Sequence, residues 1–197
     1  PAAGTGLSSH ELNLPGTYKD VKDTSIVAQF RVTKNDSSSF LFQKTSNDVF
    51  ILAWTTTPWT LPSNTALTIG EKIEYVQVDT FNPYTHKPVS VVLAKDLMSK
   101  YFSEKNKELT LEQYKPGDKQ IPFKVVQQFS GKQLVGIRYE QLMPYLKPLY
   151  DADKAFTVVA GDFVTTEDGT GVVHTSPTFG ADDFRVAKQN GIPPLTI

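Results

Sequence analysis

Short strand-like segments separated by turn signals run through most of this 197-residue sequence and constrain its fold more than any other feature. Residues 25–32 alternate apolar and polar side chains, as a half-buried strand does, and residues 48–54 form a second, more apolar candidate. Further strands are predicted at 39–43, 65–69, 73–79, 89–93, 123–129, 155–160 and 171–175. This succession favours a mixed α/β, β-rich fold, with a barrel-like sheet and short peripheral helices.

Helical patterns are fewer and shorter than the strand patterns. We expect short helices at 94–102 and 138–146, and a clearer one at 181–190 that Gly191 terminates. Residues 1–24 have the character of an extended arm. The sequence contains neither an internal repeat nor a low-complexity tract. We therefore predict one domain over 1–197, cut from a longer polypeptide.

Composition narrows the possible functions. The hydrophobic content of 39% and the charged content of 21% are typical of a soluble globular protein. The absence of cysteine excludes disulfides, thiolate metal sites and a cysteine nucleophile, and three widely separated histidines give no metal triad. A net charge of −1 indicates that any nucleic acid would be held only at the end of a strand. We expect a cytoplasmic monomer that uses no membrane, no metal and no cofactor in this domain.

The first motif is Trp54-Thr-Thr-Thr-Pro-Trp-Thr-Leu-Pro-Ser-Asn64, directly after the strand at 48–54. Alternation along the strand directs Thr55 and Thr57 to one face and Thr56 to the other. Sheet pairing should stop at Pro58, because proline has no N–H and restricts the residue before it. Hydroxyls at such a strand end can hydrogen-bond a sugar, an ester carbonyl or a water molecule.

Two larger side chains complete this motif. Trp59 offers a broad apolar wall with one N–H donor, and Asn64 can both donate to and accept from a base or a ribose. Threonines are also common in strands for packing reasons alone. The residue types of this motif therefore leave a purely structural role open.

The second motif is Gly169-Thr-Gly-Val-Val-His-Thr-Ser-Pro-Thr-Phe-Gly-Ala-Asp-Asp183. A turn at its start leads into a strand that places His174 near the strand end. Two adjacent carboxylates, Asp182 and Asp183, then begin the last predicted helix. Asp182 is explained by the favourable interaction of an acidic side chain with a helix N-terminus. Asp183 and His174 remain candidates for a functional role.

Together, in this order, the two motifs resemble those of the editing (CP1) domain of isoleucyl-tRNA synthetase, a class I aminoacyl-tRNA synthetase. The resemblance covers residues from Ile26 to Ile197. In the sister enzymes for valine and leucine the third threonine and the tryptophan are replaced, so Trp59 points to the isoleucine enzyme. One departure is Pro177-Thr-Phe-Gly180, where many bacterial relatives have a second histidine. The resemblance implies the editing-domain fold of the valyl, isoleucyl and leucyl enzymes.

The resemblance also implies roles for particular residues. Asp183 would bind the α-ammonium of a misattached amino acid, and the free amino group would thereby be required. The pocket for the amino-acid side chain would admit valine and block the extra methylene of isoleucine. The catalytic set would be Asp183, Thr55, Thr56 and Thr57, and the substrate-binding set Trp59, Thr60, Asn64 and His174.

The function implied by the resemblance is proofreading, the hydrolysis of mischarged valyl-tRNA(Ile), with valyl-adenylate as a second candidate substrate. The partners would be the tRNA(Ile) 3′ end carrying valine and the rest of the parent synthetase, which would bind ATP and form the adenylate. Two alternatives stay open. One is a hydrolase with a threonine nucleophile from 55–57 and His174 as its base. The other is a non-catalytic barrel that binds the aminoacyl-tRNA end.

Overall fold

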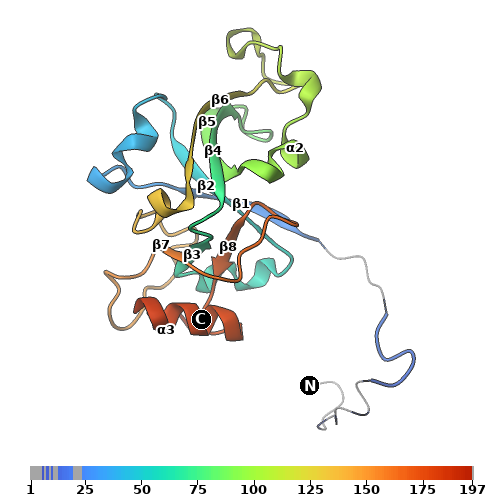
Figure 1. Cartoon of the computed structure of the whole chain (residues 1–197), viewed down its shortest axis with the longest axis vertical. Helices are drawn as coiled ribbons and strands as arrows, with labels where there is room; N and C mark the ends of the chain where they lie inside the picture. Colours follow the sequence, from blue (N-terminus) through green and yellow to red (C-terminus); the bar gives the residue numbers. More distant parts are fainter. Residues whose placement is uncertain (1–5, 7, 9, 11–12, 20–23, 197) are drawn as a thin grey trace.

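The computed structural model describes residues 6, 8, 10, 13–19 and 24–196 (Figure 1). The arm predicted at 1–24 lies partly outside this range, and its described part contains turns at Asn13 and Thr17. The strands are β1 (Ile26–Arg31), β2 (Val49–Thr55), β3 (Ala66–Ile69), β4 (Glu74–Phe81), β5 (Pro88–Ala94), β6 (Lys124–Ser130), β7 (Thr157–Ala160) and β8 (Val172–Thr175). The α-helices are α2 (Met98–Tyr101) and α3 (Ala181–Asn190). The 3₁₀ helices are η1 (Asp36–Phe42), η2 (Pro58–Ser63), η3 (Lys95–Leu97), η4 (Glu104–Asn106), η5 (Leu111–Gln113) and η6 (Gly131–Leu134).

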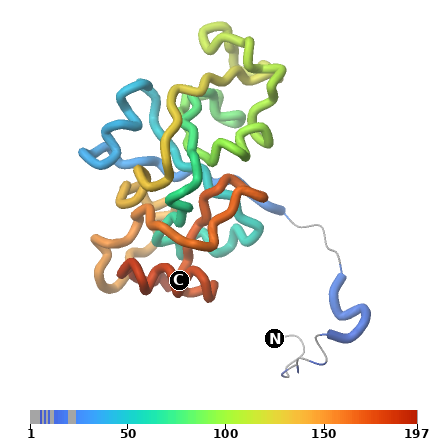
Figure 2. Tube along the Cα trace, in the orientation of Figure 1, coloured from blue at the N-terminus to red at the C-terminus, as the bar shows by residue number. Residues whose placement is uncertain are grey.

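The strands form two sheets. The larger one has the order β1-β2-β5-β4-β6, in which only β2 and β5 run parallel. The smaller one has the order β7-β3-β8, with β3 parallel to β7 and antiparallel to β8. In Figure 1 the smaller sheet lies below the larger one, and α3 lies beneath the smaller sheet. Figure 2 follows the chain through this arrangement, in which β8 returns beside β3 from more than 100 positions away in sequence.

Mixed sheets with few short helices are therefore confirmed, but the barrel-like closure is not observed. A closed barrel needs hydrogen bonds between the two outermost strands of a sheet. Within the described part of the chain, β1 and β6 lie at opposite edges of the larger sheet and each pairs with one neighbouring strand. Isolated bridges from Val32 to Tyr139 and from Arg138 to Thr157 connect the two sheets only at single points.

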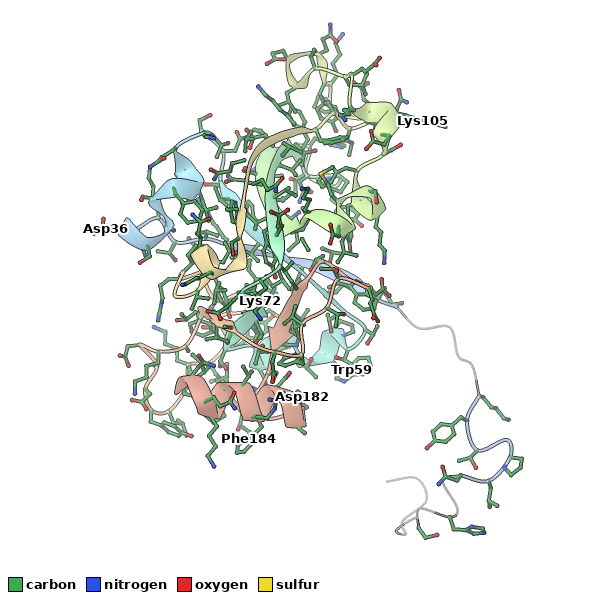
Figure 3. All side chains as sticks on the ribbon, in the orientation of Figure 1. Asp36, Trp59, Lys72, Lys105, Asp182 and Phe184 are labelled. Atoms are coloured by element: carbon green, nitrogen blue, oxygen red, sulfur yellow. The ribbon has the colours of Figure 1, made fainter. Side chains whose placement is uncertain are left out.

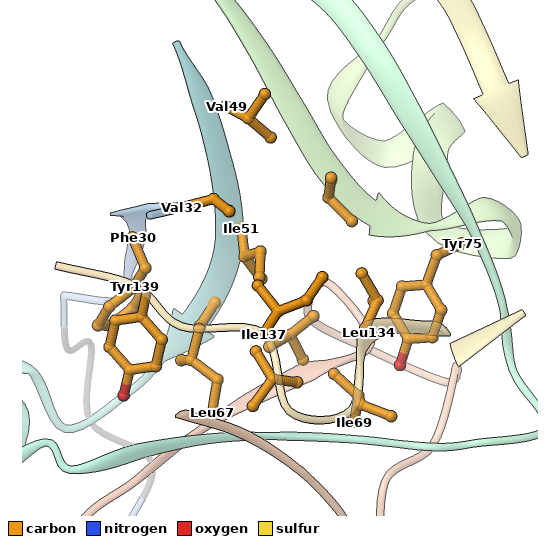
Figure 4. Close-up of a cluster of buried hydrophobic side chains, with 14 of the residues drawn as sticks. Phe30, Val32, Val49, Ile51, Leu67, Ile69, Tyr75, Leu134, Ile137 and Tyr139 are labelled. Atoms are coloured by element: carbon orange, nitrogen blue, oxygen red, sulfur yellow. The ribbon is translucent and has the colours of Figure 1, made fainter. Parts of the chain in front are cut away.

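The main hydrophobic core fills the space between the two sheets (Figure 4). Phe30 and Ile51 enter it from the larger sheet, and Leu67 and Ile69 enter it from β3. Each of these four side chains is fully buried, which supplies the apolar area that stabilises such a fold. Two smaller clusters cover the outer faces: α2 packs on the larger sheet, and Val186 and Ala187 of α3 pack on the smaller one.

Two predicted elements are wrong. The strand expected at 39–43 lies within η1, because Asn35 caps that helix: its side chain accepts from the Ser38 N–H, and the Ser38 hydroxyl accepts from the Asn35 N–H. The helix expected at 138–146 is absent. Its first residues make the isolated bridges to both sheets, so their backbone groups are already used.

A close approach at Gly171 joins the turn before β8 to the larger sheet. The residue has φ +71°, and a Cβ placed there would lie 2.3 Å from the Cβ of Ala94. The Gly171 carbonyl accepts from the hydroxyl of Tyr75 at 2.6 Å, and the neighbouring Thr170 carbonyl accepts from the Ala94 N–H at 2.8 Å. Only glycine satisfies both the backbone angle and the space at this position.

We expect Gly171→Ala to lower the free energy of unfolding by about 2–5 kcal/mol, through the left-handed backbone and the overpacking against Ala94. Gly136→Ala is the matched control, because Gly136 also has positive φ (+85°) but nothing lies within 4 Å of its added Cβ. The control should lose only about 1–2 kcal/mol. Urea denaturation of the three proteins measures both values, and equal losses would contradict the steric explanation.

Candidate functional site

The threonine motif begins where β2 ends. Thr55 is the last residue of β2 and is buried, whereas Thr57 leaves extended geometry at φ −122° and ψ 65° and precedes η2. The Thr55 hydroxyl accepts from the Thr57 N–H at 3.0 Å, and the two hydroxyls lie 3.3 Å apart. The strand end is thus a tight turn that brings these two hydroxyls together. Thr56 and Thr57 are both exposed, so the alternation predicted along the strand does not continue past Thr55, where β2 ends.

The helix η2 connects this turn to His174 of β8. The Thr60 hydroxyl donates to the Thr57 carbonyl at 2.8 Å and lies 2.8 Å from His174 Nε2. On the other side of the imidazole, Nδ1 lies 3.1 Å from the amide nitrogen of Asn64. The two contacts of the imidazole span more than 100 positions of sequence and involve side chains that are at least 93% buried. The structure therefore brings Thr57, Thr60, Asn64 and His174 into one hydrogen-bonded group.

Burial controls the charge of this histidine. Desolvation lowers the pKa of His174 from its usual 6.5 to about 4, because the cationic form is disfavoured away from water. The ring is therefore neutral at physiological pH, and both of its nitrogens already have partners. A histidine in this state is a weak general base and suits a fixed, uncharged wall better.

Asp183 occupies the first turn of α3, at the end of β8. Its Oδ2 accepts from the Ser176 N–H at 2.9 Å, and no hydrogen bond of the described residues uses its other oxygen. Burial, opposed by the bond from Ser176 and reinforced by the charge of Asp182, raises the pKa of Asp183. None of the ion pairs found among the described residues, with N–O distances up to 4.0 Å, involves this carboxylate. Asp183 is thus a half-buried acceptor that an added cation would stabilise.

The neighbouring carboxylate behaves differently. Asp182 is exposed and pairs with Arg185 at 3.2 Å, one turn along α3, and Arg185 also pairs with Asp162 at 3.1 Å. Such an arrangement is typical of a surface network at a helix N-terminus. The structural role predicted for Asp182 agrees with these contacts.

The remaining predicted residues divide by exposure. Trp59 is 62% exposed on η2, so its indole faces solvent rather than the core (Figure 3). Asn64, in contrast, is 2% exposed, which places its amide out of reach of a base or a ribose at the surface. Two surface hollows of about 230 and 260 Å³ lie elsewhere, one beside η5 and one beside the C-terminal half of α3, and neither is lined by a predicted site residue.

Two residues of this site were not predicted from the sequence. Tyr139 is 3% exposed and donates its hydroxyl to Asn64 Oδ1 at 2.7 Å. Ser176 holds Asp183 through its N–H, and its hydroxyl donates to the Ser63 carbonyl of η2 at 3.1 Å. Ser176 lies inside the second motif, between His174 and Asp183, so its place in the sequence could have marked it as a site residue. Nothing in the sequence marks Tyr139, because it lies 75 positions from its partner.

Among the described residues, no group of three or more histidine, aspartate or glutamate side chains is placed to hold a metal ion. The same part of the chain contains no helix of the length and apolar character that crossing a bilayer requires.

The depressed pKa of His174 predicts a specific loss of stability in acid. Below pH 6.5 the unfolded chain takes up a proton at this histidine and the folded chain does not, so stability falls between pH 6.5 and about 4. The loss attributable to His174 approaches about 3 kcal/mol at the lower limit, since each unit of pKa difference corresponds to about 1.4 kcal/mol.

Urea denaturation across this pH range, compared with His174→Gln, measures that loss. Since glutamine does not titrate, the difference in unfolding free energy between the two proteins should shrink as the pH falls. A difference that is independent of pH would contradict the buried, neutral histidine.

Comparison with known proteins identifies long relatives that contain this sequence. Isoleucine–tRNA ligase of Cytophaga hutchinsonii is 67% identical over 195 residues, which are 99% of this chain and 17% of that protein. The enzymes of the same name from Bacteroides fragilis and Treponema denticola are 58% and 39% identical, over 100% and 98% of this chain. The chain spans 17% of the length of each of these relatives. No protein-family model matches it.

Solved structures show the same fold at low sequence identity. GlLeuRS-CP1 aligns over 85% of this chain and 65% of its own, with a TM-score of 0.59 and 15% identity. The editing domain of the P. knowlesi cytosolic leucyl-tRNA synthetase aligns over 84% of this chain and 62% of its own, with a TM-score of 0.59 and 12% identity. Over its whole length the chain is thus homologous to a segment of isoleucine–tRNA ligases, and it has the fold of the CP1 editing domains of leucyl-tRNA synthetases.

Proposed function

We propose that this chain is a proofreading hydrolase that removes valine from mischarged valyl-tRNA(Ile), with valyl-adenylate as a second substrate. The observation that carries the proposal is the half-buried carboxylate of Asp183, which lacks a cationic partner within the described part of the chain, in a sequence that matches isoleucine–tRNA ligases throughout. An aminoacyl ester presents an α-ammonium, and that group is the complement of this carboxylate. Binding of the ammonium would relieve the unfavourable burial of the negative charge.

The second part of the proposal concerns the side chain of the amino acid. A binding pocket gains only about 1–3 kcal/mol from one methylene, a limit for which isoleucine against valine is the standard illustration. A second site that is too small for the correct amino acid overcomes this limit. Thr60 and His174 suit such a site, because their mutual hydrogen bond and their burial fix the position of both side chains.

The geometry favours attack by water over attack by threonine. A threonine nucleophile from 55–57 needs a base in contact with its hydroxyl. His174 instead contacts Thr60, whose hydroxyl already donates to the Thr57 carbonyl. The hydroxyls of Thr55 and Thr57, with the exposed Thr56, suit the positioning of a water molecule and of the terminal ribose. Catalysis would then rest on positioning and on groups of the substrate itself, without a cofactor or a metal.

The proposed partners follow from the same argument. The tRNA(Ile) 3′ end would enter with the ester first, and the near-neutral charge of the domain implies that the parent synthetase holds the body of the tRNA. Trp59, exposed beside the threonine turn, is available to contact the terminal nucleotide or the amino-acid side chain. The setting we propose is a monomeric enzyme in the cytoplasm.

The deciding experiment is deacylation of valyl-tRNA(Ile) beside isoleucyl-tRNA(Ile) at high protein concentration. We expect selective hydrolysis of the valyl ester and a loss of about 10- to 100-fold in Asp183→Ala, because a hydrogen bond to a charged group contributes about 1.5–3 kcal/mol. Asp182→Ala is the matched control. It removes a carboxylate one residue away that pairs with Arg185, and it should change the rate less than about twofold.

Two results would count against the proposal. Equal rate losses in Asp183→Ala and Asp182→Ala would show that Asp183 has no specific role in the reaction. Tight binding of a non-hydrolysable valyl-adenosine analogue without turnover of the ester would instead favour a non-catalytic module that binds the aminoacyl-tRNA end.

A further inference from the structure

The buried group around His174 contains an unbroken chain of hydrogen bonds whose direction can be assigned. It begins at the Tyr139 hydroxyl, which lies 2.7 Å from the Asn64 oxygen, and continues from the Asn64 nitrogen to Nδ1 of the imidazole at 3.1 Å. From Nε2 it passes to the Thr60 hydroxyl at 2.8 Å, and it ends at the Thr57 carbonyl, 2.8 Å from that hydroxyl. The hydroxyl of Tyr139 and the side chains of Asn64 and His174 are all removed from solvent. Each donor in such a place needs an acceptor, so the arrangement is restricted to few proton placements.

The orientation of the Asn64 amide is the first step of the assignment. Its nitrogen faces the carbonyls of Ala66, at 2.8 Å, and Thr175, at 3.4 Å. Carbonyls only accept hydrogen bonds, so an exchange of the amide oxygen and nitrogen would set acceptors against acceptors. The oxygen of Asn64 must therefore face Tyr139, whose hydroxyl can donate to it.

The tautomer of His174 follows from this orientation. An amide N–H of Asn64 points at Nδ1, so Nδ1 must carry the lone pair and the ring proton must lie on Nε2. Nε2–H then donates to the Thr60 hydroxyl, and that hydroxyl passes its own proton to the Thr57 carbonyl. The two N–H groups of Asn64 then donate to the Ala66 carbonyl and to Nδ1, its two shortest contacts, and the Thr175 carbonyl lies farther away at 3.4 Å. The reverse tautomer would set Nδ1–H against this N–H, donor against donor.

We propose that Asn64, held by Tyr139, is a positioning residue that fixes the Nε2–H tautomer of His174 and thereby the wall that Thr60 and His174 present to the substrate. The inference rests on the proposed function and reassigns Asn64 from contact with the substrate to the support of a residue that makes this contact. Asn64 has both ends of its amide occupied and is 2% exposed, so it acts only through its neighbours.

The consequence for specificity is steric. A site that rejects one additional methylene needs a wall that does not move, because a side chain free to rotate would yield to the larger substrate. Loss of the Asn64 donor would permit the other tautomer, in which Nδ1 carries the proton. Nε2 would then accept from Thr60, whose hydroxyl would leave the Thr57 carbonyl and rotate.

The direct test is the tautomer itself, measured from the ¹⁵N chemical shifts of the imidazole in the full chain at pH 7.5, with assignment by His174→Gln. We expect a protonated Nε2 and an unprotonated Nδ1 in the unchanged protein. In Asn64→Asp, an isosteric acceptor replaces the donor, and we expect the proton to move to Nδ1. This measurement needs neither tRNA nor activity, so its outcome is separate from that of the Asp183 experiment.

The functional test is the ratio of deacylation rates for valyl-tRNA(Ile) and isoleucyl-tRNA(Ile). We expect this ratio to fall at least about fivefold in Asn64→Asp, within the range that one methylene can account for, and by a smaller factor in Tyr139→Phe. Tyr75→Phe is the matched control. It also removes a hydroxyl from a fully buried tyrosine, which donates to the Gly171 carbonyl, but it lies outside the chain of bonds.

The outcomes separate positioning from general stability. A changed ratio in Asn64→Asp and Tyr139→Phe with an unchanged ratio in Tyr75→Phe supports the proposal. A proton on Nδ1 in the unchanged protein overturns it, and that measurement remains decisive where a variant does not fold. An unchanged tautomer and ratio in Asn64→Asp, or an equal effect of Tyr75→Phe on the ratio, overturns it as well.

Discussion

The buried amide of Asn64 is the contact on which the geometry of the site depends. A primary amide away from water must satisfy two donors and an acceptor, and each partner left out would cost about 1–3 kcal/mol. In this protein the partners come from β3, from the end of β8, from the imidazole of His174 and from the hydroxyl of Tyr139. One side chain therefore connects segments that are up to 111 positions apart in sequence. Their relative positions are fixed by the need to satisfy its polar atoms.

The two sheets provide the frame for this contact. The main core between them buries Phe30, Ile51, Leu67 and Ile69, and the close approach at Gly171 ties the turn before β8 to the larger sheet. The far face of the smaller sheet is covered by α3, whose first turn carries Asp183. His174 and Asp183 thus reach the same end of β8 from different elements. The function that we propose pairs the neutral imidazole with the side chain of an aminoacyl ester and the carboxylate of Asp183 with its ammonium.

Much of the fold could be predicted from local pattern. Alternation and apolar runs located β1 to β8 within one or two residues of their ends, and Gly191 marked the end of α3, where it adopts φ +65°. The two errors have a common cause. At 39–43 the cap made by Asn35 outweighed the apolar pattern, and at 138–146 bridges to both sheets outweighed helical spacing. Closure of the sheet could not be predicted either, because strand order depends on which edges meet in space.

The sequence by itself determined the residues of the two motifs, the end of sheet pairing before Pro58 and the place of Asp182 at a helix N-terminus, since these depend on neighbours in the chain. The sequence also establishes homology to isoleucine–tRNA ligases over almost the whole chain. Only the tertiary structure decided that Asn64 is buried, that Tyr139 holds it and that His174 is buried, neutral and bonded to Thr60. The physical reason is that burial and hydrogen-bond direction are properties of residues distant in sequence. Both properties are set only when the two sheets pack against a shared core and exclude water from it.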